Sequence, residues 1–383
     1  MKQDEEILIG PGWNRMISSH VCYSLGISNI NPVEIEVEPI LIWGDDKRNL
    51  AINIEVDEES YYHVFQKAIE LFGFENVARM PMMNDKSSHL NEHKYIGTKA
   101  NGEKVYLHAC ALLICLDGVE SHFDVDEVTD EKGNTILCTK DFIEECDNRT
   151  ILRYNILQSS ILKRIKGIQK QIEKNGKKYP KMYERPLSEE DYQLFYNGDL
   201  DDIPDFGSRH IQRLTRLLMK KRKDDVFAEL LNIQGLDIVE KLYALSEEYS
   251  LITEEMIAEH KKKYLLPPFQ NRFPYGILFA EDAAWLIHYW IGLTWKQTAE
   301  LLQYVFEKKE KEAESLVGLS ICQGRDNGLK NDNIYRILHS LFNRPLIRSK
   351  AHLAGRLYLP VYLAGLKHKY FHTDYEIKSN NND

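Results

Sequence analysis

The chain has 383 residues and a formal net charge of −10, and 43% of its residues are hydrophobic. This length predicts two or three domains with packed cores. No apolar run reaches the roughly 18 residues that a membrane-spanning helix needs, and the acidic start lacks the order of a signal peptide. We therefore expect a cytoplasmic protein without a membrane partner, whose six cysteines are reduced thiols.

Charge is divided unevenly along the chain. Residues 1–150 hold 13 Lys and Arg against 28 Asp and Glu, a net charge of −15. The remaining 36 basic and 31 acidic residues give residues 151–383 a net charge of +5. The overall pI of 5.8 excludes a general nucleic-acid coat protein, but it leaves room for a basic face on the second half.

The first half of the chain combines strand and helix patterns. Alternating or continuous apolar runs predict strands over residues 5–10, 34–43, 50–56, 77–82, 104–116, 122–128 and 135–139. Helices are predicted over residues 14–25 and 60–71. The second of these helices is long enough to connect two parallel strands, and Lys132-Gly133-Asn134 predicts a hairpin turn. We predict an acidic α+β or α/β domain over residues 1–150.

The second half is predicted to be almost wholly helical. Apolar residues three or four apart predict an amphipathic helix: Leu157, Ile161, Ile165, Ile168 and Ile172. Residues 176–207 are rich in charge, Tyr, Pro and Gly, which indicates a linker or insertion. Further helices are predicted over residues 208–233, 237–249, 253–264, 281–306, 332–342 and 353–370. We predict a larger, mostly all-α domain over 151–375 and a frayed tail over 376–383.

The most organised stretch is Glu281–Phe306, two helical runs that meet near Gly292. Thr294 and Gln297 have the spacing of a capping box at the start of the second run. This second run resembles the first helix of a helix-turn-helix unit. However, a charged helix is predicted to continue over residues 303–314, where a recognition helix would begin. We therefore interpret the tryptophans of this stretch as core residues.

The strongest functional candidate is a basic helix face. Its members recur every three or four residues: Arg209, Arg213, Arg216, Lys220 and Lys223. A second basic segment contributes Arg344, Arg348 and Arg356, interleaved with tyrosines. Such residues can contact the phosphates of DNA or RNA, so our leading hypothesis is a nucleic-acid-associated protein. The alternative is a solvated face that pairs with the acidic first half.

Two further patterns suggest a divalent metal. His89 and His93 belong to an H-x-x-E-H motif that can bind Zn²⁺, with His108 and Cys110 as candidates for further ligands. Asp124 and Asp126 share one face of a predicted strand beside His122 and could hold Mg²⁺ in a hydrolase or nuclease. Surface histidines and the wet face of a strand are the corresponding alternatives.

A glycine turn near the N-terminus gives a third class of candidate. Gly10, Gly12, Asn14 and Arg15 lie between a predicted strand and a predicted helix, where backbone amides can meet a phosphate. The opening ILIGPGWN resembles that of sirtuin-like NAD-hydrolysing domains over about ten residues, which implies a nucleotide hydrolase. A plain tight turn is the alternative. A helical scaffold that binds a partner protein along the 157–172 stripe also remains open.

Overall fold

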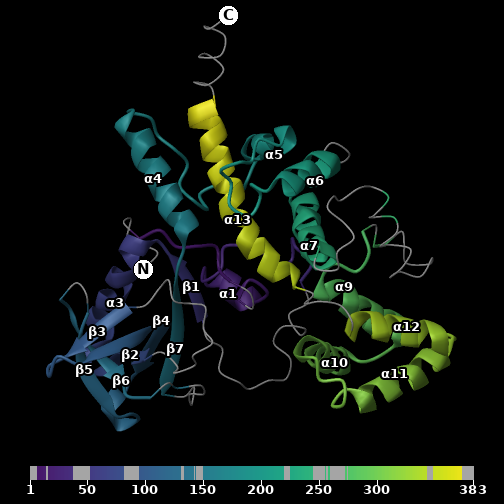
Figure 1. Cartoon of the computed structure of the whole chain (residues 1–383), viewed down its shortest axis with the longest axis horizontal. Helices are drawn as coiled ribbons and strands as arrows, with labels where there is room; N and C mark the ends of the chain where they lie inside the picture. Colours follow the sequence, from purple (N-terminus) through teal and green to yellow (C-terminus); the bar gives the residue numbers. More distant parts are fainter. Residues whose placement is uncertain are drawn as a thin grey trace, which may run out of the picture. The chain divides into compact units, whose positions relative to one another are not determined.

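The computed structural model describes residues 7–13, 16–37, 52–81, 95–130, 133–141, 143, 150–219, 225–244, 255, 258, 272–273, 275–342 and 348–372. The chain forms two compact units (Figure 1). Unit 1 comprises Met1–Gly12 and Lys47–Gln171, and unit 2 comprises Trp13–Asp46 and Ile172–Asp383. The N-terminal half carries a mixed sheet and the C-terminal half is mainly helical, as the sequence predicts.

The sheet of unit 1 is mixed and partly closed. Its described strands are β1 (Ile52–Val56), β2 (Val77–Pro81), β3 (Tyr95–Lys99), β4 (Lys104–Cys115), β5 (Val125–Thr129), β6 (Thr135–Thr139) and β7 (Ile151–Gln158). Their order is β1-β7-β4-β2-β6-β5-β3, and β3 also pairs with β4. The pairings from β4 through β2, β6, β5 and β3 return to β4. They close a ring, from which β7 and β1 extend.

The predicted local elements of this unit are mostly confirmed, but their pairing is not. The strand, helix and strand over residues 50–82 are β1, α3 (Glu58–Phe72) and β2. These two strands do not pair with each other, because β1 runs parallel to β7 and β2 runs parallel to β6. The predicted hairpin is confirmed as β5 and β6, and Gly133 adopts a φ of 85° in its turn.

Helix α3 covers the sheet with one apolar face. Its residues Tyr61, Val64, Phe65 and Ala68 pack against β2, β4 and β7. These positions recur three or four apart, as a helix on a sheet requires. The N-cap is Asp57, whose Oδ1 accepts the backbone N–H of Glu59 at 3.1 Å and that of Ser60 at 3.2 Å.

Three sequence predictions differ from the structure in extent or in type. Leu157 belongs to β7, so the amphipathic helix is α4 (Ser160–Lys174), which begins after that strand. The helix predicted over residues 14–25 is α1 (His20–Ser24), preceded by a turn. The strand predicted over residues 34–43 is wrong at its start, because residues 34–36 lie in a turn, and residues 38–43 lie outside the described residues.

Unit 2 is built from helices. They are η4 (Glu189–Tyr192), α5 (Gln193–Asn197), α6 (Arg209–Met219), α7 (Val226–Ala244), α9 (Ala280–Trp285), η6 (Leu286–Ile291), α10 (Trp295–Glu307), α11 (Glu314–Asp326), α12 (Asn331–Phe342), α13 (Lys350–Lys367) and η7 (His368–His372), besides α1. Helix α13 packs against α7, α5 and η4, and its whole middle part is buried (Figure 1). Pro360 lies inside α13 and does not end it, in agreement with the helix predicted over residues 353–370.

Helix α7 differs from the predicted helix boundaries. The sequence predicts one helix ending at residue 233 and another beginning at 237, yet α7 runs continuously through Gly235. A Cβ atom at Gly235 would lie 3.2 Å from the side chains of Leu278 and Phe279. Glycine is therefore used here for close packing and not to break the helix.

The predicted hairpin of residues 281–306 forms a core of unit 2. Leu286, Ile287 and Ile291 of η6 are buried with Leu301 and Leu302 of α10. The capping box is confirmed, because Gln297 N donates to Thr294 Oγ1 at 3.3 Å and Thr294 N donates to Gln297 Oε1 at 3.0 Å. The continuous charged helix over 303–314 is wrong, since α10 ends at Glu307 and Lys308 turns the chain at a φ of 56°.

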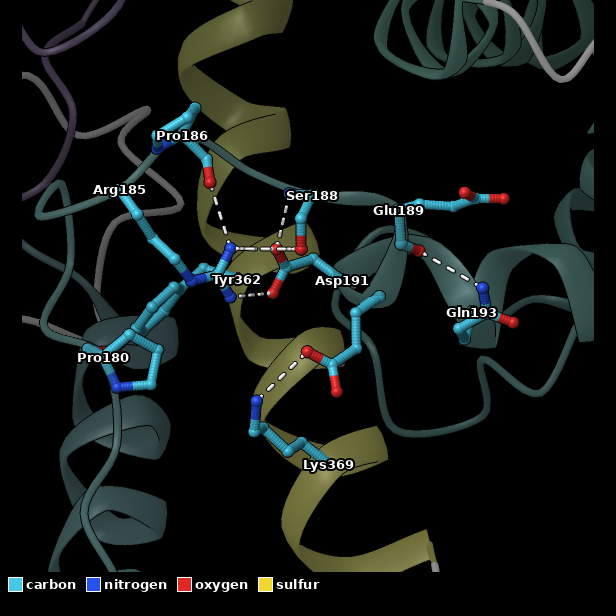
Figure 2. A network of polar contacts seen from close by, with 10 residues as sticks. Pro180, Arg185, Pro186, Ser188, Glu189, Asp191, Gln193, Tyr362 and Lys369 are labelled. Carbon is cyan, nitrogen blue, oxygen red and sulfur yellow. Dashed lines mark hydrogen bonds and ion pairs between the residues drawn. The ribbon is translucent and has the colours of Figure 1, made fainter.

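Residues 176–207 are packed within unit 2. Phe195, Leu200 and Phe206 are buried. Figure 2 shows the polar contacts that fix this segment, in which the Arg185 guanidinium binds the Asp191 carboxylate at 2.7 and 2.8 Å. Tyr362 Oη of α13 donates to the Pro180 carbonyl at 2.7 Å. Several residues of this segment line the cavity described below, among them Arg185 and Tyr192.

Candidate functional site

The basic face predicted on the helical half lies on α6. Arg209, Arg213 and Arg216 are exposed there, and the opposite face buries Ile211, Leu214 and Leu218. The 3.6-residue period of the helix thus separates guanidinium groups from apolar groups. Lys220 and Lys223, the other two members of the predicted face, lie outside the described residues.

The three arginines differ in their contacts. Arg216 Nη2 donates to the carbonyl of Gly198 at 3.0 Å, and its side chain lies over the Gly198 Cα. Arg209 and Arg213 form no hydrogen bond or ion pair with any described residue. These two arginines lie one helical turn apart on the exposed face of α6.

The second basic segment is used differently. Arg356 binds Asp205 with an N–O distance of 2.7 Å. His352 lies one helical turn before Arg356 on α13, and its Nε2 contacts the guanidinium of Arg348, which precedes the helix. Arg348 and His352 are half-buried. Burial, together with Arg348 and Arg356, lowers the pKa of His352 to about 4, so this imidazole is neutral at pH 7. Arg344 lies outside the described residues.

The acidic strand carries local ion pairs. Lys99 Nζ lies 2.9 Å from Asp126, and Lys140 Nζ lies 3.8 Å from Asp124, whose side chain is 86% exposed. His122 Nε2 lies 2.7 Å from Asp117, and its ring lowers the pKa of that carboxyl group. Each of the three predicted catalytic groups therefore already has an oppositely charged or hydrogen-bonding neighbour.

The described residues contain no group of three or more His, Cys, Asp or Glu side chains that could hold a metal ion. His89 and His93 lie outside the described residues. His108 and Cys110 belong to strand β4, but their side chains are also outside the description. The Zn²⁺ site therefore stays a prediction, because the side chains of all four of its candidate ligands lie outside the description. The described cysteines Cys22, Cys115, Cys138 and Cys322 are free thiols.

The glycine turn of residues 10–12 packs against the carboxylate of Glu55. A Cβ atom at Gly10 would lie 2.7 Å from Oε2 of Glu55, so Gly10 packs directly against an acidic side chain. Gly12 has a φ of 111°, which favours glycine, and Asn14 and Arg15 lie outside the described residues. The helix after this turn, α1, begins only at His20 and has five residues. It offers no extended helix N-terminus for a phosphate.

No family model matches the sequence, and no curated protein matches it significantly. Within the described part of the chain, no helix has both the length and the apolar character to cross a membrane.

The sequence reasoning missed one group of polar and aromatic residues. Glu281, Trp285 and Tyr289 lie four residues apart along α9 and η6, and all three line one cavity. The four-residue spacing of Trp285 and Tyr289 is visible in the sequence, where the tryptophans of this stretch are interpreted as core residues. A glutamate in register with them was the available signal, because a carboxylate on an otherwise apolar face needs a reason to be there.

Proposed function

We propose that the helical unit binds the phosphate backbone of a nucleic acid through the exposed face of α6. The observation that carries this proposal is the pair Arg209 and Arg213, both exposed and both without a partner among the described residues. Four residues on a helix correspond to a rise of about 6 Å, which places the two side chains along one line. Guanidinium groups of this kind bind phosphate oxygens well.

The contrast with other basic residues of unit 2 supports this choice. Arg185 binds Asp191 at 2.7 Å, Arg356 binds Asp205 at 2.7 Å, and Lys367 binds Asp202 at 3.1 Å. A basic residue that only balances internal charge is expected to have such a partner. The proposal therefore rests on Arg209 and Arg213 and assigns Arg356 to the internal ion pairs.

The test is a double charge reversal, Arg209→Glu with Arg213→Glu, in the full-length chain. Both side chains are exposed, so the fold should be retained. We expect binding of labelled DNA and RNA to weaken and the slope of log K against log salt to become less steep by about two, one for each lost phosphate contact. Fluorescence anisotropy across a salt series measures both quantities.

A matched control uses Lys177→Glu with Lys178→Glu. These two lysines are also exposed basic residues of unit 2, and the reversal changes the net charge by the same amount. The proposal requires the control to keep the wild-type slope. Equal losses in both double variants would show that only total charge matters. No measurable binding by the wild-type chain at low salt would reject the proposal outright.

A further inference from the structure

A large cavity lies entirely within unit 2. Its volume is about 1420 Å³, above the roughly 300–1,000 Å³ of most small-molecule sites. Its walls come from α1, the loop of residues 29–37, the segment 183–192, the start of α7, residues 272–279, α9 and η6, the start of α10 and two residues of α13. These segments are far apart in the sequence, and the cavity exists only because the helices of unit 2 bring them together.

One helix face defines the chemical character of this cavity. Glu281, Trp285 and Tyr289 are spaced by four residues and therefore share a face of α9 and η6. The face is graded, because Glu281 is 7% exposed whereas Tyr289 is 59% exposed. It passes from a buried carboxylate to an aromatic ring in contact with solvent. η6 has π-helical geometry, which occurs frequently at functional sites.

Of the two carboxylate oxygens of Glu281, one has a hydrogen-bond donor among the described residues. Its Oε2 accepts the backbone N–H of Lys350 at 2.9 Å, while its buried Oε1 has no hydrogen-bond partner among the described residues. Burial raises the pKa of Glu281 to about 7, which partly offsets the cost of this arrangement at neutral pH. A cationic group beside Oε1 would supply the missing contact and would favour the ionised carboxylate.

The aromatic part of the wall suits a cation as well. The rings of Tyr289 and Trp295 meet at 89° with centroids 5.8 Å apart, and those of Tyr289 and Trp285 lie 5.3 Å apart. The guanidinium of Arg272 already lies 4.2 Å from the centroid of Trp285. This internal contact is a cation–π interaction on one face of Trp285.

The charged residues that line the cavity also favour a cationic ligand. Its described lining contains three basic residues of the Lys and Arg type: Arg185, Arg272 and Lys350. Against these stand six carboxylates: Glu34, Glu36, Glu184, Asp225, Glu281 and Asp282. Arg185 is further neutralised by Asp191 (Figure 2), and Lys350 by Glu36 at 3.3 Å. An anionic ligand such as a phosphate is therefore disfavoured here, and a cation is favoured.

We propose that this cavity binds a linear polyamine, with one ammonium group held by Glu281 and the remaining chain laid along Trp285 and Tyr289. Glu281 and Tyr289 are eight positions apart along the chain, which on an α-helix corresponds to a rise of about 12 Å. An extended molecule with several amines and apolar methylene segments matches a face of this length, with a carboxylate at one end and aromatic rings beyond it. The proposal does not depend on nucleic-acid binding by α6.

Calorimetric titration of the full-length chain with spermidine tests the proposal. We expect saturable binding at pH 8 and a dissociation constant at least about tenfold higher for Glu281→Gln, because a charge-assisted contact is lost. Tyr289→Ala should weaken binding too, and this exposed position tolerates truncation if Glu281→Gln fails to fold. Glu300→Gln is the matched control, since Glu300 is an exposed carboxylate of α10 outside the cavity lining.

The pH dependence gives a second, independent readout. The charged groups that act on Glu281 are Lys350 from α13 and Asp282 from its own helix. Because binding needs the ionised carboxylate, wild-type affinity should fall about tenfold per pH unit below pH 7, and Glu281→Gln should lose this dependence. His20 also lines the cavity. The proposal therefore requires that His20→Gln retain the wild-type dependence of spermidine affinity on pH.

Three results would overturn the proposal. They are the absence of saturable spermidine binding at pH 8, equal affinity in Glu281→Gln and wild type, or an equal loss in Glu300→Gln. The last would mean that spermidine merely follows the net negative charge of the chain.

Discussion

Gly198 illustrates how a single residue supports the basic face. It ends α5 in the left-handed region at a φ of 69°, and the Arg216 side chain lies directly over it and donates to its carbonyl. A Cβ atom would be strained by the backbone and would displace the guanidinium. We predict that Gly198→Ala lowers the free energy of unfolding by about 1 kcal/mol, as measured by urea denaturation.

Gly318 provides a control of opposite sign. It lies inside α11, and a Cβ atom there would have no heavy atom within 4 Å. Gly318→Ala should therefore stabilise the chain by about 0.5 to 1 kcal/mol, because alanine favours the helix. If both substitutions changed stability in the same direction, the left-handed strain at Gly198 would not be the cause.

At the scale of elements, Asp57 joins two helices of unit 1. It caps α3, is 1% exposed, and accepts a hydrogen bond from Lys166 Nζ of α4 at 3.0 Å. Burial alone would raise the pKa of Asp57, but hydrogen bonds from Ser60 and Lys166 lower it below its ordinary value. We predict that Asp57→Ala destabilises the chain by about 3 kcal/mol at pH 7, since the cap and the partner of Lys166 are both lost.

The same contact fixes a pH dependence. A lowered carboxyl pKa stabilises the fold above the unfolded value near 3.8, and this stabilisation disappears as the pH falls through the folded pKa. The difference between wild type and Asp57→Ala should therefore shrink below pH 4 in urea titrations. Ser60→Ala removes only the hydroxyl hydrogen bond and should cost about 1 kcal/mol. A cost as large as that of Asp57→Ala would contradict a role for Lys166.

Helix boundaries depend on residues close together in the sequence, whereas strand pairing depends on residues far apart. The capping box at Thr294 and the helix at residues 58–72 were predictable, because their signals lie within a few residues. The pairing of β2 with β6, almost 60 residues later, was not, since nothing local selects a strand's neighbour. Leu157 continued the apolar spacing of α4 by coincidence, and its strand pairing with β1 decided its structure.

The candidate sites divide in the same way. The exposed arginines of α6 follow from helical periodicity alone, and the sequence placed them on one face. The cavity was not predictable, because its wall joins segments as distant as residues 29–37 and Lys350. The unsatisfied oxygen of Glu281 is also a property of tertiary packing.

For the whole molecule, two buried groups of unit 2 act oppositely on stability. Burial raises the pKa of Glu281 from 4.5 to about 7, so raising the pH from 4.5 to 7 destabilises the fold. The pKa of His352 is lowered from 6.5 to about 4, so lowering the pH from 6.5 to 4 destabilises it. Each shift corresponds to about 3 kcal/mol at about 1.4 kcal/mol per pH unit. In wild type the two effects largely cancel between pH 4.5 and 6.5.

Removal of one group should therefore reveal the other. We predict that the unfolding free energy of Glu281→Gln rises with pH between 4.5 and 6.5, relative to wild type, and that His352→Gln shows a relative fall over the same range. Arg348 and Arg356 act on His352, and Lys350 and Asp282 act on Glu281. Urea unfolding at half-unit pH steps measures both slopes. Parallel slopes for the two variants and wild type would show that neither shifted group contributes to the pH dependence of folding.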